Sequence, residues 1–311
     1  MPRSLDDSWD IATSVGATAV MVALARAAET ASDQPLIRDP FAEPLVSTPE
    51  LAGVREQVAA WWTEPDGDDD PGDGDYSVRA QNMIDSQAVR THFFDAYFAA
   101  AAQAGIRQVV LLAAGLDSRA YRLDWPAGTV VYEIDLPKVL EYKTETLADC
   151  GATPAADLRP VPADLRHDWP QALRDKGFDA GQPTAWLAEG LLPFLPAAAQ
   201  ERLFVAIDGL SAPGSRVSVE NFGIDPAKRR EAEARFAELR AKREARGQDI
   251  SFNPFDLWFE DGERPDCADW FTAHGWSTGV VDGHEEALRL GRDPQPEGRP
   301  FVVTYVTATK P

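Results

Sequence analysis

Cysteine is scarce in this 311-residue chain. Only Cys150 and Cys267 occur, far apart and outside any Cys-x-x-Cys motif, so the sequence indicates neither a disulfide framework nor a zinc site. A reducing compartment, the cytoplasm, is the simplest setting for such a chain.

Basic residues are also few, because 30 Lys and Arg face 51 Asp and Glu and the formal net charge is -21. Nucleic acids bind to basic surfaces that release counterions from phosphates, and anionic membranes attract the same kind of surface. The composition therefore disfavours nucleic acid and membrane partners.

Long apolar runs are missing as well. The longest such stretch near the N-terminus, roughly residues 15–25, is short for a membrane span and follows acidic rather than basic residues, so no signal peptide is predicted. Hydrophobic residues nevertheless make up 44% of the chain, with 9 Trp and 14 Phe. This composition is typical of an ordered globular protein with a large core.

An acidic segment at residues 66–75 alternates Asp with Gly and Pro, and it predicts a solvent-exposed loop. A calcium loop of the EF-hand type requires a bidentate Glu at its twelfth position, and counting from Asp66 that position is Ser77. We therefore predict no metal site.

The centre of the chain carries the main functional signal. Residues 109–114 are a continuous apolar run, as expected for a strand buried on both faces of a parallel sheet, and Gly115 ends it with a residue that permits a sharp turn and close ligand approach. A second apolar run, 130–135, ends in Asp135, which follows Gly115 by 20 residues. This interval is typical of a βαβ unit whose acid contacts ribose hydroxyls. The pattern favours an adenosine-containing ligand.

The glycine pattern discriminates between two such ligands. A dinucleotide fingerprint needs Gly-x-Gly-x-x-Gly, but this loop reads Ala113-Ala-Gly115-Leu-Asp117-Ser118 and lacks two of the three glycines. Asp117 would also repel a pyrophosphate, whereas a ligand with a sulfonium and an ammonium group tolerates it. S-adenosylmethionine therefore fits better than NAD, although a buried strand followed by a simple turn fits the glycine alone about as well.

Further strands are predicted at 158–161, 183–190, 215–221, 276–281 and 301–307, and helices at 8–31, 51–62, 83–104, 138–149, 197–210 and 228–246. Four successive strands end in or beside a carboxylate: Asp135, Asp164, Glu189 and Glu220. In an open parallel sheet such ends line the ligand crevice. Arg90, on the helix before the first central strand, is either a surface arginine or a bidentate partner for a ligand carboxylate.

Taken together, these motifs resemble the S-adenosylmethionine-dependent methyltransferases related to leucine carboxyl methyltransferases. The resemblance covers nearly the whole chain and is carried by five segments: Val89-Arg90-Thr-His-Phe-Phe94, Ala114-Gly115-Leu-Asp117-Ser118-Arg119-Ala-Tyr121-Arg122-Leu123, Tyr132-Glu-Ile-Asp135-Leu-Pro137, Ala163-Asp164-Leu165 and Glu189-Gly190-Leu191-Leu192. One departure is Ala113, where the family pattern usually has another glycine.

The resemblance implies a role for each matched residue. Arg90 would hold the methionine carboxylate of S-adenosyl-L-methionine and Glu189 would face its ammonium group. Gly115 would let the cofactor approach, and Asp135 would take the ribose hydroxyls. Asp164 and Leu165 would flank the adenine. No catalytic residue is named.

The resemblance also implies an α/β fold of the class I methyltransferase, Rossmann-like type, with a mostly parallel seven-stranded sheet and an antiparallel last strand. We expect residues 1–311 to form one domain, with an N-terminal helical cap (about 1–85) and an insertion (about 224–265) that contributes to the lid. The implied activity is methyl transfer, by O-methylation, to a small-molecule or carboxylate-bearing acceptor. Two alternatives stay open: a Rossmann-type NAD(P)-dependent oxidoreductase and a non-catalytic binding protein.

Overall fold

The computed structural model describes residues 15–63, 74–224, 257–259, 264–292 and 301–311, with the single positions 11, 230, 234, 237 and 241. One seven-stranded sheet runs through the molecule in the order β3-β2-β1-β4-β5-β7-β6. Its strands are β1 (Gln108–Leu112), β2 (Val130–Asp135), β3 (Asp157–Pro162), β4 (Thr184–Ala188), β5 (Arg216–Ile224), β6 (Ser277–Asp282) and β7 (Phe301–Thr309). β1 to β5 pair in parallel, and β7 runs antiparallel to both of its neighbours, β5 and β6. The predicted fold is therefore confirmed.

Both faces of the sheet are buried, because successive side chains of each strand point to opposite faces. Val109 and Leu111 of β1 belong to one core cluster, and Val110 and Leu112 to the other. The first cluster includes apolar residues of α4 (Gly74–Gln103) and α6 (Pro137–Asp149). The second includes α7 (Trp169–Asp175), α8 (Ala197–Leu210) and α10 (Cys267–Ala273). Helices on both faces explain why the central strands are continuous apolar runs.

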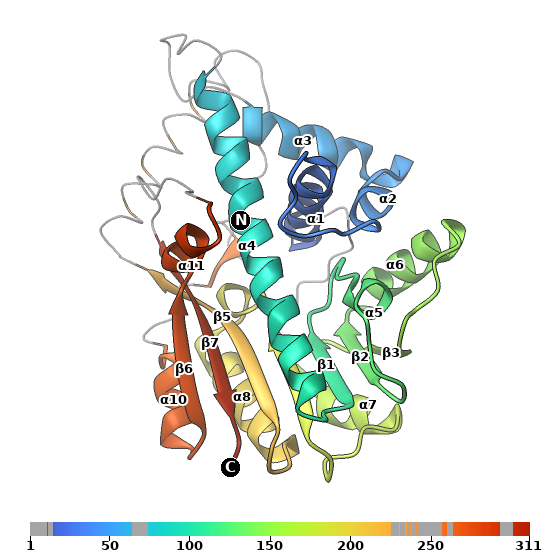
Figure 1. Cartoon of the computed structure of the whole chain (residues 1–311), viewed down its shortest axis with the longest axis vertical. Helices are drawn as coiled ribbons and strands as arrows, with labels where there is room; N and C mark the ends of the chain where they lie inside the picture. Colours follow the sequence, from blue (N-terminus) through green and yellow to red (C-terminus); the bar gives the residue numbers. More distant parts are fainter. Residues whose placement is uncertain are drawn as a thin grey trace.

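Four N-terminal elements lie beyond the end of the sheet where the parallel strands finish (Figure 1). They are α1 (Val15–Ala31), α2 (Ala42–Val46), the 3-10 helix η1 (Pro49–Leu51) and α3 (Ala52–Thr63). The long helix α4 then runs from this end down the sheet (Figure 1). The helical elements therefore stand at the edge where the sequence places its acids.

Several predicted boundaries differ from the observed ones. β5 continues to Ile224 because residues 221–224 pair with residues 301–304 of β7, so Glu220 lies inside the strand. A short helix, α11 (Gly283–Arg289), lies between β6 and β7, where no helix was predicted, and the Asp282 side chain caps it by accepting from the backbone N–H groups of His284 and Glu285. α4 begins at Gly74, inside the predicted acidic loop. Most of that loop and of the 224–265 insertion lies outside the described residues.

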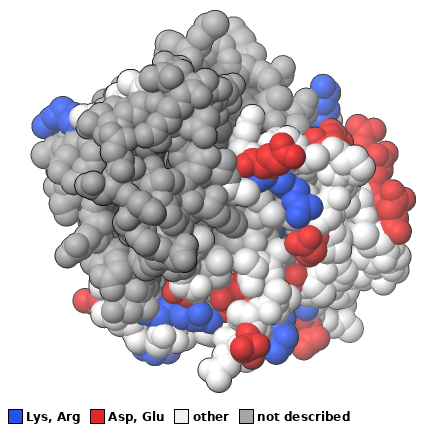
Figure 2. Space-filling model, turned by 90° about the horizontal axis from the view of Figure 1, so that it is seen from above, with Lys and Arg blue, Asp and Glu red and all other residues white. Residues whose placement is uncertain are grey.

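The surface at the N-terminal helical end mixes both signs of charge. Figure 2 shows acidic and basic side chains interspersed over the described part of this face, with no continuous basic patch there. Among the described helices, none combines the length and apolar character needed to cross a bilayer.

Candidate active site

The strand register brings the sequence-predicted acids to one edge. Leu112, the last residue of β1, lies opposite both Ile134 and Ala188. The residues that follow these three positions therefore lie level at the carboxyl edge: Ala113, Asp135 and Glu189. Ligands of open α/β sheets bind beyond this edge.

The turn after β1 has an unusual backbone. Ala113 and Gly115 have φ angles of 54° and 49°, and Ala113 is the only non-glycine residue with positive φ in the described chain. The turn is closed by the Asp117 N–H, which donates to the Ala114 carbonyl over 2.8 Å. A Cβ on Gly115 would lie 3.4 Å from the Cβ of Ala19, an ordinary contact. The left-handed backbone, rather than lack of space, is therefore the clearest reason for glycine at 115.

Asp135 holds this turn directly. One of its oxygens accepts from the Gly115 N–H at 2.7 Å, and the other accepts from the Leu136 N–H at 2.7 Å. Burial raises the pKa of Asp135, the nearby charge of Asp164 adds to this effect, and the two N–H groups oppose it. Each carboxylate oxygen keeps a second lone pair for another donor. The predicted proximity of Gly115 and Asp135 is thus present.

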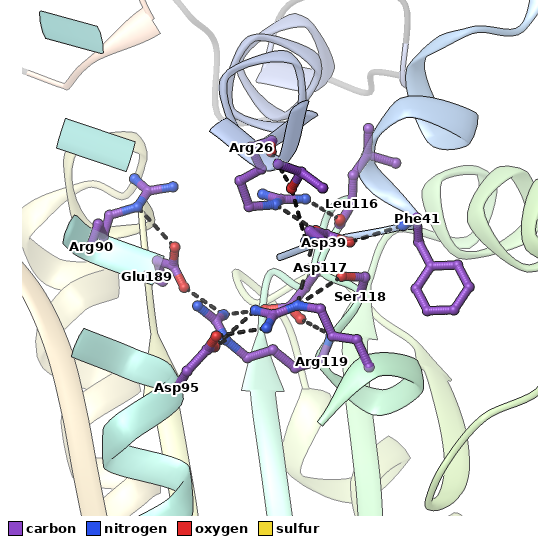
Figure 3. A network of polar contacts seen from close by, with 12 residues as sticks. Arg26, Asp39, Phe41, Arg90, Asp95, Leu116, Asp117, Ser118, Arg119 and Glu189 are labelled. Atoms are coloured by element: carbon purple, nitrogen blue, oxygen red, sulfur yellow. Dashed lines mark hydrogen bonds and ion pairs between the residues drawn. The ribbon is translucent and has the colours of Figure 1, made fainter. Parts of the chain in front are cut away.

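Arg90 is buried on α4 between two carboxylates. Its Nε lies 2.8 Å from Glu189 Oε1 and its Nη1 lies 3.1 Å from Glu220 Oε2. Burial lowers the pKa of Arg90, but Glu220 and Glu189 together outweigh burial and raise it. In Figure 3 the two Nη atoms lie on the far side of the guanidinium from Glu189. The alternative of an ordinary surface arginine is therefore wrong.

Arg119, the first residue of the short helix α5 (Arg119–Arg122), joins three carboxylates (Figure 3). It pairs with Asp95 of α4 at 2.7 Å, with Glu189 at 2.7 Å and with Asp117. Burial lowers the pKa of Arg119, but Asp117, Glu189 and Asp95 outweigh it and hold the pKa well above its usual value. The turn after β1, the end of β4 and helix α4 are thus linked through one side chain.

The N-terminal helices are tied to the same turn. Arg26 of α1 donates from Nη2 to the Leu116 carbonyl at 2.7 Å and from Nε to Asp39 at 2.9 Å (Figure 3). Asp39 is 1% exposed. Burial raises its pKa, but Arg26 and Arg122 outweigh this and lower it. The turn after β1 is therefore held by Arg26 of helix α1 as well as by Asp135 of strand β2.

A buried ion pair supports the turn from α6. Lys143 Nζ lies 2.7 Å from Glu133 Oε2 and donates to the Asp117 carbonyl at 3.0 Å. Both partner side chains are 1% exposed. Lys143 thus holds the backbone carbonyl of Asp117, while Arg119 holds its carboxylate.

Asp164 and Leu165 follow β3 at the same edge. The Asp164 carboxylate is held by Arg166 in a close pair at 2.6 Å, with the Arg166 backbone N–H donating to it as well. Burial raises the pKa of Asp164, but the hydrogen bonds from Arg166 outweigh it and lower the pKa. Leu165 packs, half-buried, against the second core cluster. Asp164 lies close enough to Asp135 for its charge to raise the pKa of Asp135.

Sequence reasoning missed the residues that connect these groups. Asp95 and Arg119 carried a signal, because a charged residue within an apolar helix face or beside a buried strand needs a partner. Arg26 and Lys143 carried none, since their partners lie 90 and 26 residues away. The sequence also did not show that the negative charge of Asp117 is paired: burial raises its pKa, but Arg119 and Lys143 outweigh this and lower it, and Arg119 pairs with the carboxylate.

Comparison with known proteins identifies the family. A family model described as leucine carboxyl methyltransferase matches residues 19–208. The chain belongs to the leucine carboxyl methyltransferase family. The resemblance predicted from the sequence is therefore confirmed, and the matched residues include the turn after β1 and the predicted acids through Glu189.

Close relatives of this family member occur in mycobacteria. A protein of Mycobacterium marinum (strain ATCC BAA-535 / M) named "Putative S-adenosyl-L-methionine-dependent methyltransferase" is 71% identical over 314 residues, covering 100% of both chains. A protein of the same name from Mycobacterium avium (strain 104) is 55% identical and covers 95% of this chain and 90% of its own length. Among solved structures, magnesium protoporphyrin IX methyltransferase from Synechocystis PCC 6803 is 12% identical, with 84% and 95% of the chains covered and a TM-score of 0.47.

Proposed function

We propose that this protein is an S-adenosyl-L-methionine-dependent methyltransferase that O-methylates a small-molecule or carboxylate-bearing acceptor. Membership of the leucine carboxyl methyltransferase family and the names of its close relatives support the cofactor. The residues of the site support the cofactor as well, and the acceptor is inferred from the sheet edge and the net charge.

One observation carries the cofactor assignment: Arg90 and Glu189 form an adjacent pair of opposite charges whose remaining positions are complementary to an amino acid. Within the described chain, Arg90 Nη2 has no hydrogen-bond acceptor, while Nε lies at ion-pair distance from Glu189 and Nη1 donates to Glu220. A guanidinium presents such free N–H groups to a carboxylate, and a carboxylate accepts from an ammonium group. The methionine end of the cofactor carries both groups, so the residues fit it.

The charge balance of the cluster also favours a cationic ligand. Four arginines, Arg26, Arg90, Arg119 and Arg122, contact five carboxylates, those of Asp39, Asp95, Asp117, Glu189 and Glu220, so four positive charges face five negative ones. A buried excess of negative charge is costly unless it is paired. A ligand with a sulfonium and an ammonium group supplies the missing positive charge.

The adenosine end has matching residues. Asp135 keeps a lone pair on each oxygen for ribose hydroxyls, and Asp164 and Leu165 stand at the next strand end for the adenine. The bound cofactor supplies a methyl group already activated by its sulfonium. The chain therefore needs to bind, orient and exclude water, and a carboxylate acceptor, ionised at neutral pH, requires no general base.

The acceptor side is inferred from the C-terminal part of the sheet edge. Phe222 of β5 packs on Trp258 with ring centroids 5.5 Å apart, beyond Glu220 on the same strand. Trp258 and the described Phe259 belong to the predicted insertion, whose Phe252 and Phe255 lie outside the described residues. Apolar aromatic walls with few polar groups are typical of small-molecule sites.

The net charge of -21 supports the exclusion of nucleic acid as an acceptor. The two free cysteines support a cytoplasmic location.

Calorimetry with S-adenosylhomocysteine tests the cofactor assignment. Asp135→Ala and Arg90→Lys should each weaken binding roughly tenfold to hundredfold. The first variant removes a charged hydrogen bond, and the second keeps the charge but loses the planar guanidinium. NAD should not bind to the parent protein. Unchanged affinity in both variants, or tight NAD binding, would contradict the assignment.

A methyl-transfer screen over carboxylates, phenols, amines and RNA tests the acceptor. Carboxylates should be methylated best. Trp258→Ala should reduce methyl transfer but change the affinity for S-adenosylhomocysteine by no more than about threefold, which is less than the loss of one charged hydrogen bond would cause. Efficient methylation of RNA, or transfer that Trp258→Ala does not change, would overturn this part of the proposal.

A further inference from the structure

Glu220 lies inside β5, beside the end of β4. The register pairs Ala188 with Val219, so Glu220 is level with Glu189. It is 3% exposed, and burial raises its pKa even though Arg90 opposes this effect. A carboxylate at such a place is costly, and an apolar residue would pack there at lower cost. Its presence therefore calls for a reason other than stability.

A single oxygen of Glu220 joins two parts of the site. Oε2 accepts from Arg90 Nη1 at 3.1 Å and from the Gly190 N–H at 2.8 Å. Gly190 follows Glu189 and has a φ of 62°, a conformation that glycine adopts freely. Glu220 thus fixes the guanidinium on α4 relative to the turn that carries Glu189.

The contact between Arg90 and Glu189 is incomplete. Although Nε lies 2.8 Å from Oε1, it makes no hydrogen bond of acceptable direction, so the pair is not the bidentate fork that arginine and carboxylate prefer. The second oxygen of Glu189 is held by Arg119, and Nη1 of Arg90 is held by Glu220. Arg90 and Glu189 are therefore prevented from forming a bidentate ion pair with each other.

The surroundings keep Glu220 in this position. Tyr305 of β7 lies directly opposite Glu220 in the strand register. Its ring stacks on Phe93 of α4 with centroids 4.6 Å apart and is 3% exposed. Glu220 thus lies beside the buried Tyr305 in the sheet, and its carboxylate is bound by Arg90 and the Gly190 turn.

We propose that Glu220 is a positioning residue for the amino-acid end of the cofactor. By holding Arg90 Nη1, it stops Arg90 and Glu189 from forming a bidentate pair and keeps both available, one for the methionine carboxylate and the other for the ammonium group. This inference rests on the proposed role of Arg90.

The test compares two ligands that differ in the amino-acid end: S-adenosylhomocysteine, which has it, and 5′-methylthioadenosine, which lacks it. Glu220→Leu and Glu220→Asp should weaken S-adenosylhomocysteine binding roughly tenfold to hundredfold, because neither side chain reaches both donors. Glu220→Gln keeps an acceptor of the same reach and should stay within about fivefold of the parent, a loss smaller than one charged hydrogen bond. Affinity for 5′-methylthioadenosine should be unchanged in all three.

Glu220→Asp and Glu220→Gln separate positioning from charge, and they keep the test informative if the leucine variant does not fold. If only the charge mattered, Asp would bind normally and Gln would fail. Asp208→Asn, which changes a carboxylate bound by Lys310 and Trp276, is the matched control and should alter neither affinity.

Arg90→Leu separates this inference from the proposed function. If Arg90→Leu leaves the preference for S-adenosylhomocysteine intact, the role of Arg90 is wrong. If Arg90→Leu abolishes the preference but Glu220→Asp retains it, the role of Arg90 stands and the role of Glu220 is refuted. Equal losses for both ligands in the Glu220 variants would show a purely structural role.

Discussion

Replacing Ala113 by glycine should stabilise this protein, which is the reverse of the usual effect. A non-glycine residue in the left-handed region costs about 1–2 kcal/mol, and Ala113 has a φ of 54°. Glycine removes this cost but adds about 0.5–1 kcal/mol of conformational entropy to the unfolded chain. The expected net gain in the free energy of unfolding is about 0.5–1 kcal/mol.

Urea denaturation of the parent, Ala113→Gly and Ala114→Gly measures this gain. Ala114 has no positive φ and is 7% exposed, so its replacement loses about 0.8 kcal/mol of methyl burial in addition to the entropy cost. The two glycine variants should therefore differ by about 2 kcal/mol, with Ala113→Gly the more stable. If Ala113→Gly is destabilised as much as Ala114→Gly, the turn does not have the left-handed conformation at position 113 in solution.

Two further predictions concern the ion pairs around this turn. Arg119→Met removes one partner from each of three carboxylates, of which Asp95 keeps Arg122 and Glu189 keeps Arg90. It should lower the free energy of unfolding by about 3–5 kcal/mol in urea, and a loss below about 1 kcal/mol would contradict the central role of Arg119. Asp39 and Asp117 have pKa values below the usual 3.8, so the stability that they contribute is present above that pH and is lost as the pH falls through their lowered values. Unfolding free energies measured from pH 6 to pH 3 should fall most steeply below about pH 4, and Asp39→Asn should make that fall shallower.

The parts of the fold that follow local rules could be predicted from the sequence. β2 spans the predicted residues 130–135 and α8 the predicted residues 197–210, because an apolar run between turn residues and a 3.6-residue periodicity are local properties. The contact between Gly115 and Asp135 was also predictable, since a βαβ unit of ordinary length returns its second strand beside the first.

The pairing of charges could not be predicted in this way. Arg90 meets Glu220 across 130 residues, and this contact exists only because α4 crosses the sheet beside β5. Nor did the sequence indicate that Arg119 would pair with Asp117, its neighbour two residues away, as well as with Glu189. Which acid a buried arginine contacts depends on tertiary placement, and no spacing rule encodes it.

The hydrogen bond from Arg26 to the Leu116 carbonyl has a consequence for engineering in this family. Exchanging N-terminal segments between relatives is a natural way to alter acceptor choice, because these helices stand over the binding edge of the sheet. In this chain, however, the exchanged segment would carry away a donor that holds the turn after β1, together with Asp39, its buried partner. A chimaera that transfers the helices without an equivalent arginine would therefore lose cofactor affinity along with its original acceptor preference, so the two properties are not separable modules.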